Sequence, residues 1–167
     1  AVQAQSGSLH VPIVASAPAV DGTLGSPVWQ QALTVHLGYD RRTRGPTVED
    51  TTVRLLSDGK ALYVAFQAIQ TRTPVVSNQR SNMVGVDTDD EVKVALWPGG
   101  SHGFSYQFIA TPLGTRYQYS SENLAYEPTW DAVGRIGRNA YVVTMRIPLS
   151  IMRGARPEAW LIQLARY

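Results

Sequence analysis

Residues 51–69 read TTVRLLSDGKALYVAFQAI and contain the clearest structural signal in the chain. From Ala61 to Ile69, apolar residues recur at every second position, which is the pattern of a β-strand with one face turned to a core. The Asp58-Gly59 pair ahead of them is typical of a tight hairpin turn. The stretch therefore predicts two antiparallel strands, residues 51–56 and 61–69, joined by a turn at 57–60.

The same period-two pattern recurs along the rest of the chain, separated by Gly and Pro turns. It predicts further strands at residues 91–97, 104–110, 115–120, 130–136, 141–147 and 160–166. Only residues 29–33 and Ser150–Arg153 have the spacing of a helical turn. Since no long amphipathic helix is present, a parallel βαβ architecture is excluded. The sequence predicts an all-β fold, an antiparallel β-sandwich of the jelly-roll kind, with under about a tenth helix.

The composition excludes several classes of function. Lys and Arg number 15 against 13 Asp and Glu, and no basic stripe is present, so we expect no nucleic-acid partner. Cysteine is absent, which excludes disulfides, thiolate metal sites and a cysteine nucleophile. No segment approaches the roughly 20 apolar residues of a membrane-spanning helix.

The first residues differ from the rest of the chain. Residues 1–17 are rich in Ala, Ser, Pro and Gln, and Ala1–Gln5 resembles the small-residue end of a cleaved secretory signal. An engineered remnant or an unstructured tail would have the same composition. We expect residues 1–17 to be a flexible lead-in and residues 18–167 to form the sandwich.

Catalytic patterns are missing. Nothing in the sequence pairs two carboxylates as a glycosidase requires, and no Gly-x-Ser-x-Gly elbow is present. His10, His36 and His102 are scattered without metal-ligand spacing. The sequence therefore predicts that this chain is not an enzyme in its own right.

Seven short motifs, in their order and spacing, resemble the family 9 carbohydrate-binding modules. The resemblance covers roughly residues 18–167 and is greatest to the version at the N-terminus of large bacterial outer-membrane proteins of poorly defined function. The motifs are Val20–Leu24 with Trp29 and Ala32, Asp58–Val64, Asp89–Val92, Phe104–Phe108, Trp130–Val133, Met145–Leu149 and Trp160–Arg166.

The resemblance implies a jelly-roll sandwich that binds a glycan without catalysis, as part of a larger protein tied to polysaccharide degradation. It implies an extracytoplasmic setting, which is the periplasm, the outer membrane or the exterior. It also implies structural calcium and, in the longer proteins, a C-terminal barrel that anchors the parent chain in the membrane. Sugar-binding members sandwich a terminal sugar between two exposed Trp residues, one of them in the loop before the paired Asp residues. That loop, residues 75–83, has no aromatic residue here.

Two polar loops supply the candidate ligand-binding residues. A sugar requires planar hydrogen-bonding side chains and an aromatic face. We expect a weakly bound sugar between the two loops, with a dissociation constant nearer millimolar than micromolar, a gap of roughly 4 kcal/mol. The candidate residues are Arg80 and Asn82 in the first loop, with Glu122, Asn123, Tyr126 and Trp130 in the second.

The run Asp87-Thr88-Asp89-Asp90-Glu91 is the sharpest polar cluster in the sequence. Closely spaced carboxylates suit Ca²⁺, which takes six to eight oxygen ligands, so we consider Asp87, Asp89 and Asp90 candidate calcium ligands. The alternative is that Asp89 and Asp90 cap backbone N–H groups of the loop, as Asp does in turns.

Two other functions remain open from the sequence. Without the loop Trp, the chain is also suited to a structural or protein-interaction module beside an outer-membrane barrel. The same sandwich is shared with haem-binding electron-transfer domains, in which Met83 with His102 or Lys93 would be the axial ligands. A Met in such a loop is more often ordinary packing, so haem is the weakest of the three alternatives.

Overall fold

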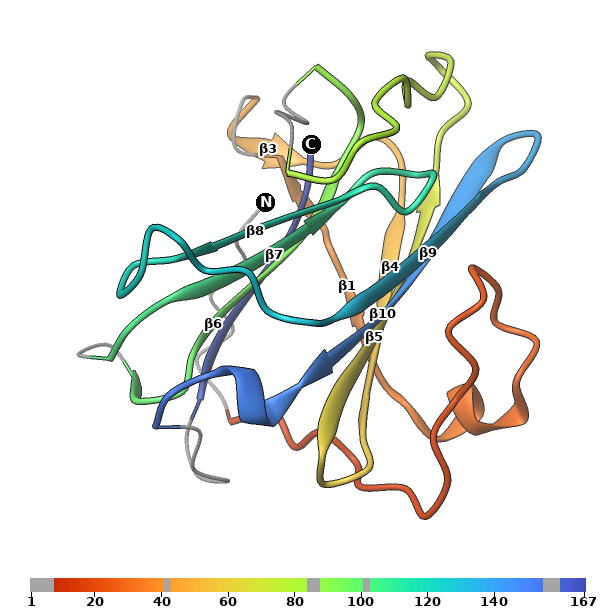
Figure 1. The fold of residues 1–167 in the computed structure, drawn as a ribbon. Helices are drawn as coiled ribbons and strands as arrows, with labels where there is room; N and C mark the ends of the chain where they lie inside the picture. The colour runs from red at the N-terminus through yellow and green to blue at the C-terminus, as the bar shows by residue number, and fades with distance from the viewer. Residues whose placement is uncertain (1–7, 41–42, 84–87, 101–102, 155–159) are drawn as a thin grey trace.

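The computed structural model describes residues 8–40, 43–83, 88–100, 103–154 and 160–167. Two antiparallel sheets face each other across one core (Figure 1). The first sheet has the order β1 (Leu33–His36), β4 (Thr51–Ser57), β5 (Ala61–Ile69), β10 (Ala140–Pro148), β9 (Asp131–Ile136). The second has the order β11 (Leu161–Arg166), β6 (Val92–Trp97), β7 (Tyr106–Ala110), β8 (Arg116–Ser120). A two-stranded ribbon joins β2 (Tyr39–Asp40) to β3 (Gly45–Pro46). The predicted antiparallel sandwich is confirmed.

The predicted hairpin is present as β4–β5, and it lies at the centre of the first sheet. The Asp58 carboxylate accepts hydrogen bonds from the backbone N–H groups of Lys60 and Ala61, at 2.9 and 2.8 Å, and from the Tyr63 hydroxyl at 2.9 Å. These bonds fix the turn, and the turn sets the strand register. Leu55 consequently lies opposite Val64, and both side chains point into the core.

The core between the sheets consists of the alternating residues that the sequence pattern selects. Val64 and Phe66 of the first sheet face Val94 and Phe108 of the second, and all four are fully buried. Trp130, at the entry to β9, packs edge-on against Phe108 with ring centroids 5.2 Å apart. Burial of this apolar surface is the main stabilising contribution to the fold.

A second, smaller cluster covers part of the outer face of the first sheet. The N-terminal segment and the short 3₁₀ helix η1 (Pro27–Gln31) place Val14 and Trp29 against Leu56 and Tyr63. The Val14 N–H donates to the Ser57 carbonyl at 2.8 Å, beside an isolated bridge from Ile13 to Ser57. Residues 12–14 therefore pair and pack with β4, ahead of the predicted boundary at residue 18.

Helical structure is confined to single turns in the described residues. They are η1 and η3 (Leu149–Ile151), close to the two turns that the sequence predicted. No helix among the described residues is long and apolar enough to span a bilayer. Trp29 is buried, and Trp160 is partly buried against the core.

One side of the sandwich is closed by the turn between β7 and β8. Gly114 has a φ of +83°, and this turn lies against the backbone of β9 at Gly134. A Cβ on Gly134 would lie 2.2 Å from the Pro112 carbonyl oxygen, well inside van der Waals contact. Only glycine therefore allows the two sheets to approach this closely.

We expect Gly134→Ala to destabilise the fold by about 2–4 kcal/mol, because the clash is with backbone and no side chain can move aside. The measurement is the urea midpoint followed by tryptophan fluorescence. Gly25→Ala is the matched control, since its Cβ would meet only Thr23 Oγ1 at an ordinary 3.5 Å. Equal losses for the two variants would show that this close approach does not matter.

Candidate functional site

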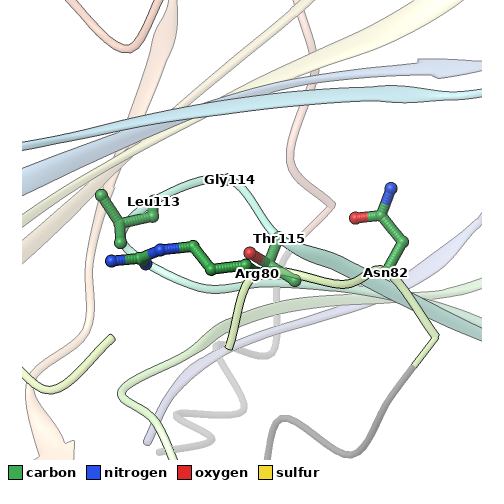
Figure 2. A pocket seen from close by; sticks show the side chains of 5 residues that line it. All are labelled: Arg80, Asn82, Leu113, Gly114 and Thr115. Carbon is green, nitrogen blue, oxygen red and sulfur yellow. The ribbon is translucent and has the colours of Figure 1, made fainter. Parts of the chain in front are cut away.

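An open hollow of about 460 Å³ lies where the segment between β5 and β6 meets the β7–β8 turn. Arg80 and Asn82 contribute from the first, and Leu113, Gly114 and Thr115 contribute from the second. Figure 2 shows the Arg80 side chain reaching toward Leu113, with Asn82 beyond Thr115. The hollow therefore combines an exposed cation and an amide with one apolar side chain.

Hydrogen bonds to the start of β8 position the Arg80 segment. Thr115 Oγ1 donates to the Gln79 carbonyl at 2.7 Å, and the Arg116 N–H donates to Asn82 Oδ1 at 2.9 Å. The Met83 N–H then donates to the Arg116 carbonyl at 2.9 Å. The segment thus follows the outer edge of a strand, which is a rigid element, and does not extend freely into solvent.

Arg80 is exposed and keeps most of its donors available. One guanidinium nitrogen donates to the Ser77 carbonyl at 3.0 Å, which bends the side chain back over its own loop. The guanidinium has five N–H donors in a fixed plane, so those not used by Ser77 face the hollow or solvent. Of the six ligand-binding residues that the sequence predicted, only Arg80 and Asn82 line this hollow.

The paired carboxylates anchor the other end of the same segment. Asp89 is buried, and its Oδ2 accepts from the backbone N–H groups of Asn78 and Gln79, each at 2.8 Å. Asp90 Oδ2 accepts from the Val76 N–H at 2.7 Å and from Gln70 Nε2 at 3.0 Å. The capping role considered for Asp89 and Asp90 is therefore present in the structure.

Two buried oxygens beside these caps have no hydrogen-bond partner within the part of the chain that the structure describes. They are Asp89 Oδ1 and Ser77 Oγ. The third predicted metal ligand, Asp87, lies outside the described residues. The described residues contain no group of three His, Asp or Glu side chains placed to bind a metal ion.

In the second predicted loop, the polar side chains of Glu122, Asn123 and Tyr126 form hydrogen bonds or ion pairs with other residues of this chain. Glu122 accepts a hydrogen bond from the Tyr106 hydroxyl at 3.0 Å and forms an ion pair with Arg153. The Tyr126 hydroxyl donates to the Ile151 carbonyl at 3.0 Å, and burial raises the pKa of Tyr126 well above its usual range. Asn123 Oδ1 accepts from the Ala125 N–H at 3.0 Å and forms a local turn.

Trp130 does not provide the predicted stacking face. It is 1% exposed, and its Nε1 donates to Gln118 Oε1 at 2.9 Å. The residue immediately precedes β9 and directs its ring inward, where the ring fills the core beside Phe108. The polar loop that precedes Trp130 does not make this side chain exposed, because strand β9 begins at the next residue, Asp131.

The two loops meet opposite ends of β8. Asn82 bonds to Arg116 at the start of β8, whereas Glu122 follows Ser120 at its end. A five-residue strand separates these points by roughly 13 Å. Arg80 and Asn82 lie against the β7–β8 turn instead. The sequence Pro112-Leu113-Gly114 indicates a turn, but it does not indicate which loop packs against that turn.

The residues considered for haem ligation are not brought together in the described residues. Met83 lies beside the start of β8 with a φ of +63°. The Lys93 ammonium on β6 donates to the Tyr167 hydroxyl at 2.9 Å. His102 lies outside the described residues.

Solved carbohydrate-binding proteins share this fold at low sequence identity. A family 9 carbohydrate-binding module from Caldicellulosiruptor kristjanssonii in complex with glucose matches with a TM-score of 0.59 and 16% identity, over 84% of this chain and 69% of that one. Its complex with cellotriose matches with a TM-score of 0.57 and 15% identity, over 83% and 66%. A candidate carbohydrate-binding protein from Bacteroides uniformis matches with a TM-score of 0.57 and 13% identity, over 73% and 62%.

The sequence itself matches no family profile and no curated protein. The chain spans about two thirds of the length of the solved structures that it resembles. This chain has the β-sandwich fold of the family 9 carbohydrate-binding modules.

Proposed function

We propose that this chain is a non-catalytic carbohydrate-binding module and that the hollow at Arg80 is its sugar site. The observation that carries the proposal is the exposed Arg80 guanidinium beside Leu113, on a loop that partly buried hydrogen bonds hold in place. A preorganised site of this kind loses little conformational entropy when it binds. The glucose and cellotriose complexes of the structural neighbour support a sugar as the ligand class.

The chemistry of the hollow suits a small hydroxylated ring. The planar donors of Arg80 can engage two neighbouring hydroxyls at once. The Asn82 amide offers further donors, because its oxygen is bonded to Arg116 and its nitrogen has no hydrogen bond to the described residues. Leu113, which is exposed, provides the apolar contact for C–H groups of the ring. None of the five described lining residues is aromatic, so the binding we propose is weak.

The wider setting is part of the same proposal and rests on the resemblance of the sequence motifs. It is an extracytoplasmic module of a larger secreted or outer-membrane protein, in which glycan binding serves polysaccharide degradation. If the parent protein lies in the outer membrane, a barrel in another part of the parent chain would attach this module to the membrane.

Titration with glucose and cellotriose, followed by amide NMR, tests the sugar site. We expect millimolar dissociation constants and shifts centred on residues 79–82 and 113–115. Arg80→Ala removes the guanidinium donors and should weaken binding about fivefold or more. Arg138→Ala, an equal charge change at an exposed position in the β9–β10 turn, should leave the affinity unchanged.

An absence of shifts at high millimolar sugar would contradict the proposal and favour the protein-interaction module. Shifts confined to residues 121–126 would retain sugar binding but exclude the Arg80 hollow. The absorption spectrum of the purified protein separates the remaining alternative, since a Soret band would identify bound haem.

Calcium at the Asp89 anchor is a second part of the proposal. A buried carboxylate oxygen and a buried hydroxyl without partners among the described residues suit a hard cation that prefers oxygen ligands. Asp89 and Ser77 would hold the ion, with Asp87 as a further candidate. The charge of the ion would stabilise the buried carboxylate and, through it, the loop that presents Arg80.

If this ion binds, removing it with a chelator should lower the melting temperature. Binding at a hundred times the dissociation constant stabilises a fold by about 2.7 kcal/mol. For a chain of this length that corresponds to a shift of roughly 5–10 °C. Asp89→Asn should abolish the difference between calcium and chelator, whereas Asp131→Asn at an exposed strand position should preserve it. Identical melting curves for the wild-type protein in calcium and chelator would leave Asp89 with the capping role alone.

A further inference from the structure

The outward face of the second sheet is a distinct surface, which we name the β8 platform. Its residues alternate with those that fill the core, so their side chains point away from it. Neither of the two hydrophobic clusters among the described residues covers this face. The outward residues are Lys93, Ala95 and Trp97 on β6, Gln107 and Ile109 on β7, Tyr117 and Tyr119 on β8, and Leu161, Gln163 and Ala165 on β11.

Strand register places these residues in rows across the sheet. Gln163 lies opposite Ala95, Ala95 opposite Gln107, and Gln107 opposite Tyr119. Ala95 is fully buried although it points outward. The row therefore places two planar amides on this face, with a tyrosine at one end.

Charge distinguishes this surface from the outward face of the other sheet. Lys93 is the one charged residue among the outward positions, and its ammonium bonds to the Tyr167 hydroxyl and lies 4.9 Å from the centre of that ring. The first sheet differs, since four of its outward positions are charged. They are Arg54, Asp131, Arg135 and Arg146. The platform is thus complementary to a ligand that is polar but uncharged.

We propose that the β8 platform binds an extended, neutral polysaccharide chain, at a site separate from the Arg80 hollow. The proposal rests on the proposed carbohydrate-binding function and adds a second surface to it. Gln107 and Gln163 each present a donor and an acceptor, which match the alternating donors and acceptors of sugar hydroxyls. The rings of Tyr117 and Tyr119, two positions apart on one strand, lie about 7 Å apart and provide apolar faces for successive C–H surfaces.

Affinity electrophoresis in gels containing hydroxyethylcellulose, a neutral polymer, tests the platform directly. We expect the wild-type protein to be retarded, and Tyr119→Ala to weaken binding about tenfold. Tyr119→Phe keeps the ring and should retain most of the retardation. Val133→Ala is the matched control, because Val133 on the first sheet and Tyr119 have the same 37% exposure.

Amide NMR with glucose and with cellohexaose then separates this proposal from the proposed function. Glucose should change the amide chemical shifts of the residues at the hollow alone. Cellohexaose should also change those of Gln107, Tyr117, Tyr119 and Gln163. Shifts at the hollow with an unaffected platform would overturn the platform proposal only. No shifts with either sugar would overturn both. Platform signals that change with protein concentration instead, together with dimers in sedimentation, would identify the surface as a contact between two copies and overturn the glycan assignment.

Discussion

Strand β5 is buried on both of its faces, and this constraint accounts for most of the surrounding structure. Its inward residues, among them Val64 and Phe66, meet the second sheet, while Tyr63 and Ala65 on the opposite face also lie out of solvent. Nine register pairs join β5 to β10, and β4 pairs with its other edge. A strand so enclosed needs cover on its outer face. The N-terminal segment and η1 provide that cover through Val14 and Trp29.

The candidate site depends on the sandwich through a chain of polar contacts. Arg166 on β11 donates to Gln70 Oε1 at 2.7 Å, and Gln70 donates in turn to Asp90 Oδ2 at 3.0 Å. Asp90 and Asp89 then fix the backbone of residues 76–79, directly ahead of Arg80. Buried polar networks are stabilising when their members are satisfied, and they specify one geometry. The loop that carries Arg80 is therefore anchored to β11, which is far from it in sequence.

The strands could be predicted from the sequence because alternation reports directly on which face of a strand is buried. Residues 57–69 are the best example, since the sequence pattern there predicted both strand β5 and the hairpin turn ahead of it. The site was harder to predict from the sequence. Which loops meet depends on sheet order, and β8 runs between Asn82 and Glu122, so the two predicted halves of the site are separated. Trp130 shows the same limit, because one residue of register decides whether a ring at a strand entry faces solvent or core.

The contact between Gly134 and the Pro112 turn also affects how the molecule behaves toward copies of itself. An unpaired strand edge is a template on which another chain can add by backbone hydrogen bonding. The turn places Gly114 beside Ala132 O and Gly134 N, so the middle of the outer β9 edge is occupied by the protein's own backbone. Intermolecular strand addition at this edge is thereby blocked by sterics alone. Neighbouring copies at high local concentration would therefore remain separate molecules along that edge, without a charged residue being needed there to keep them apart.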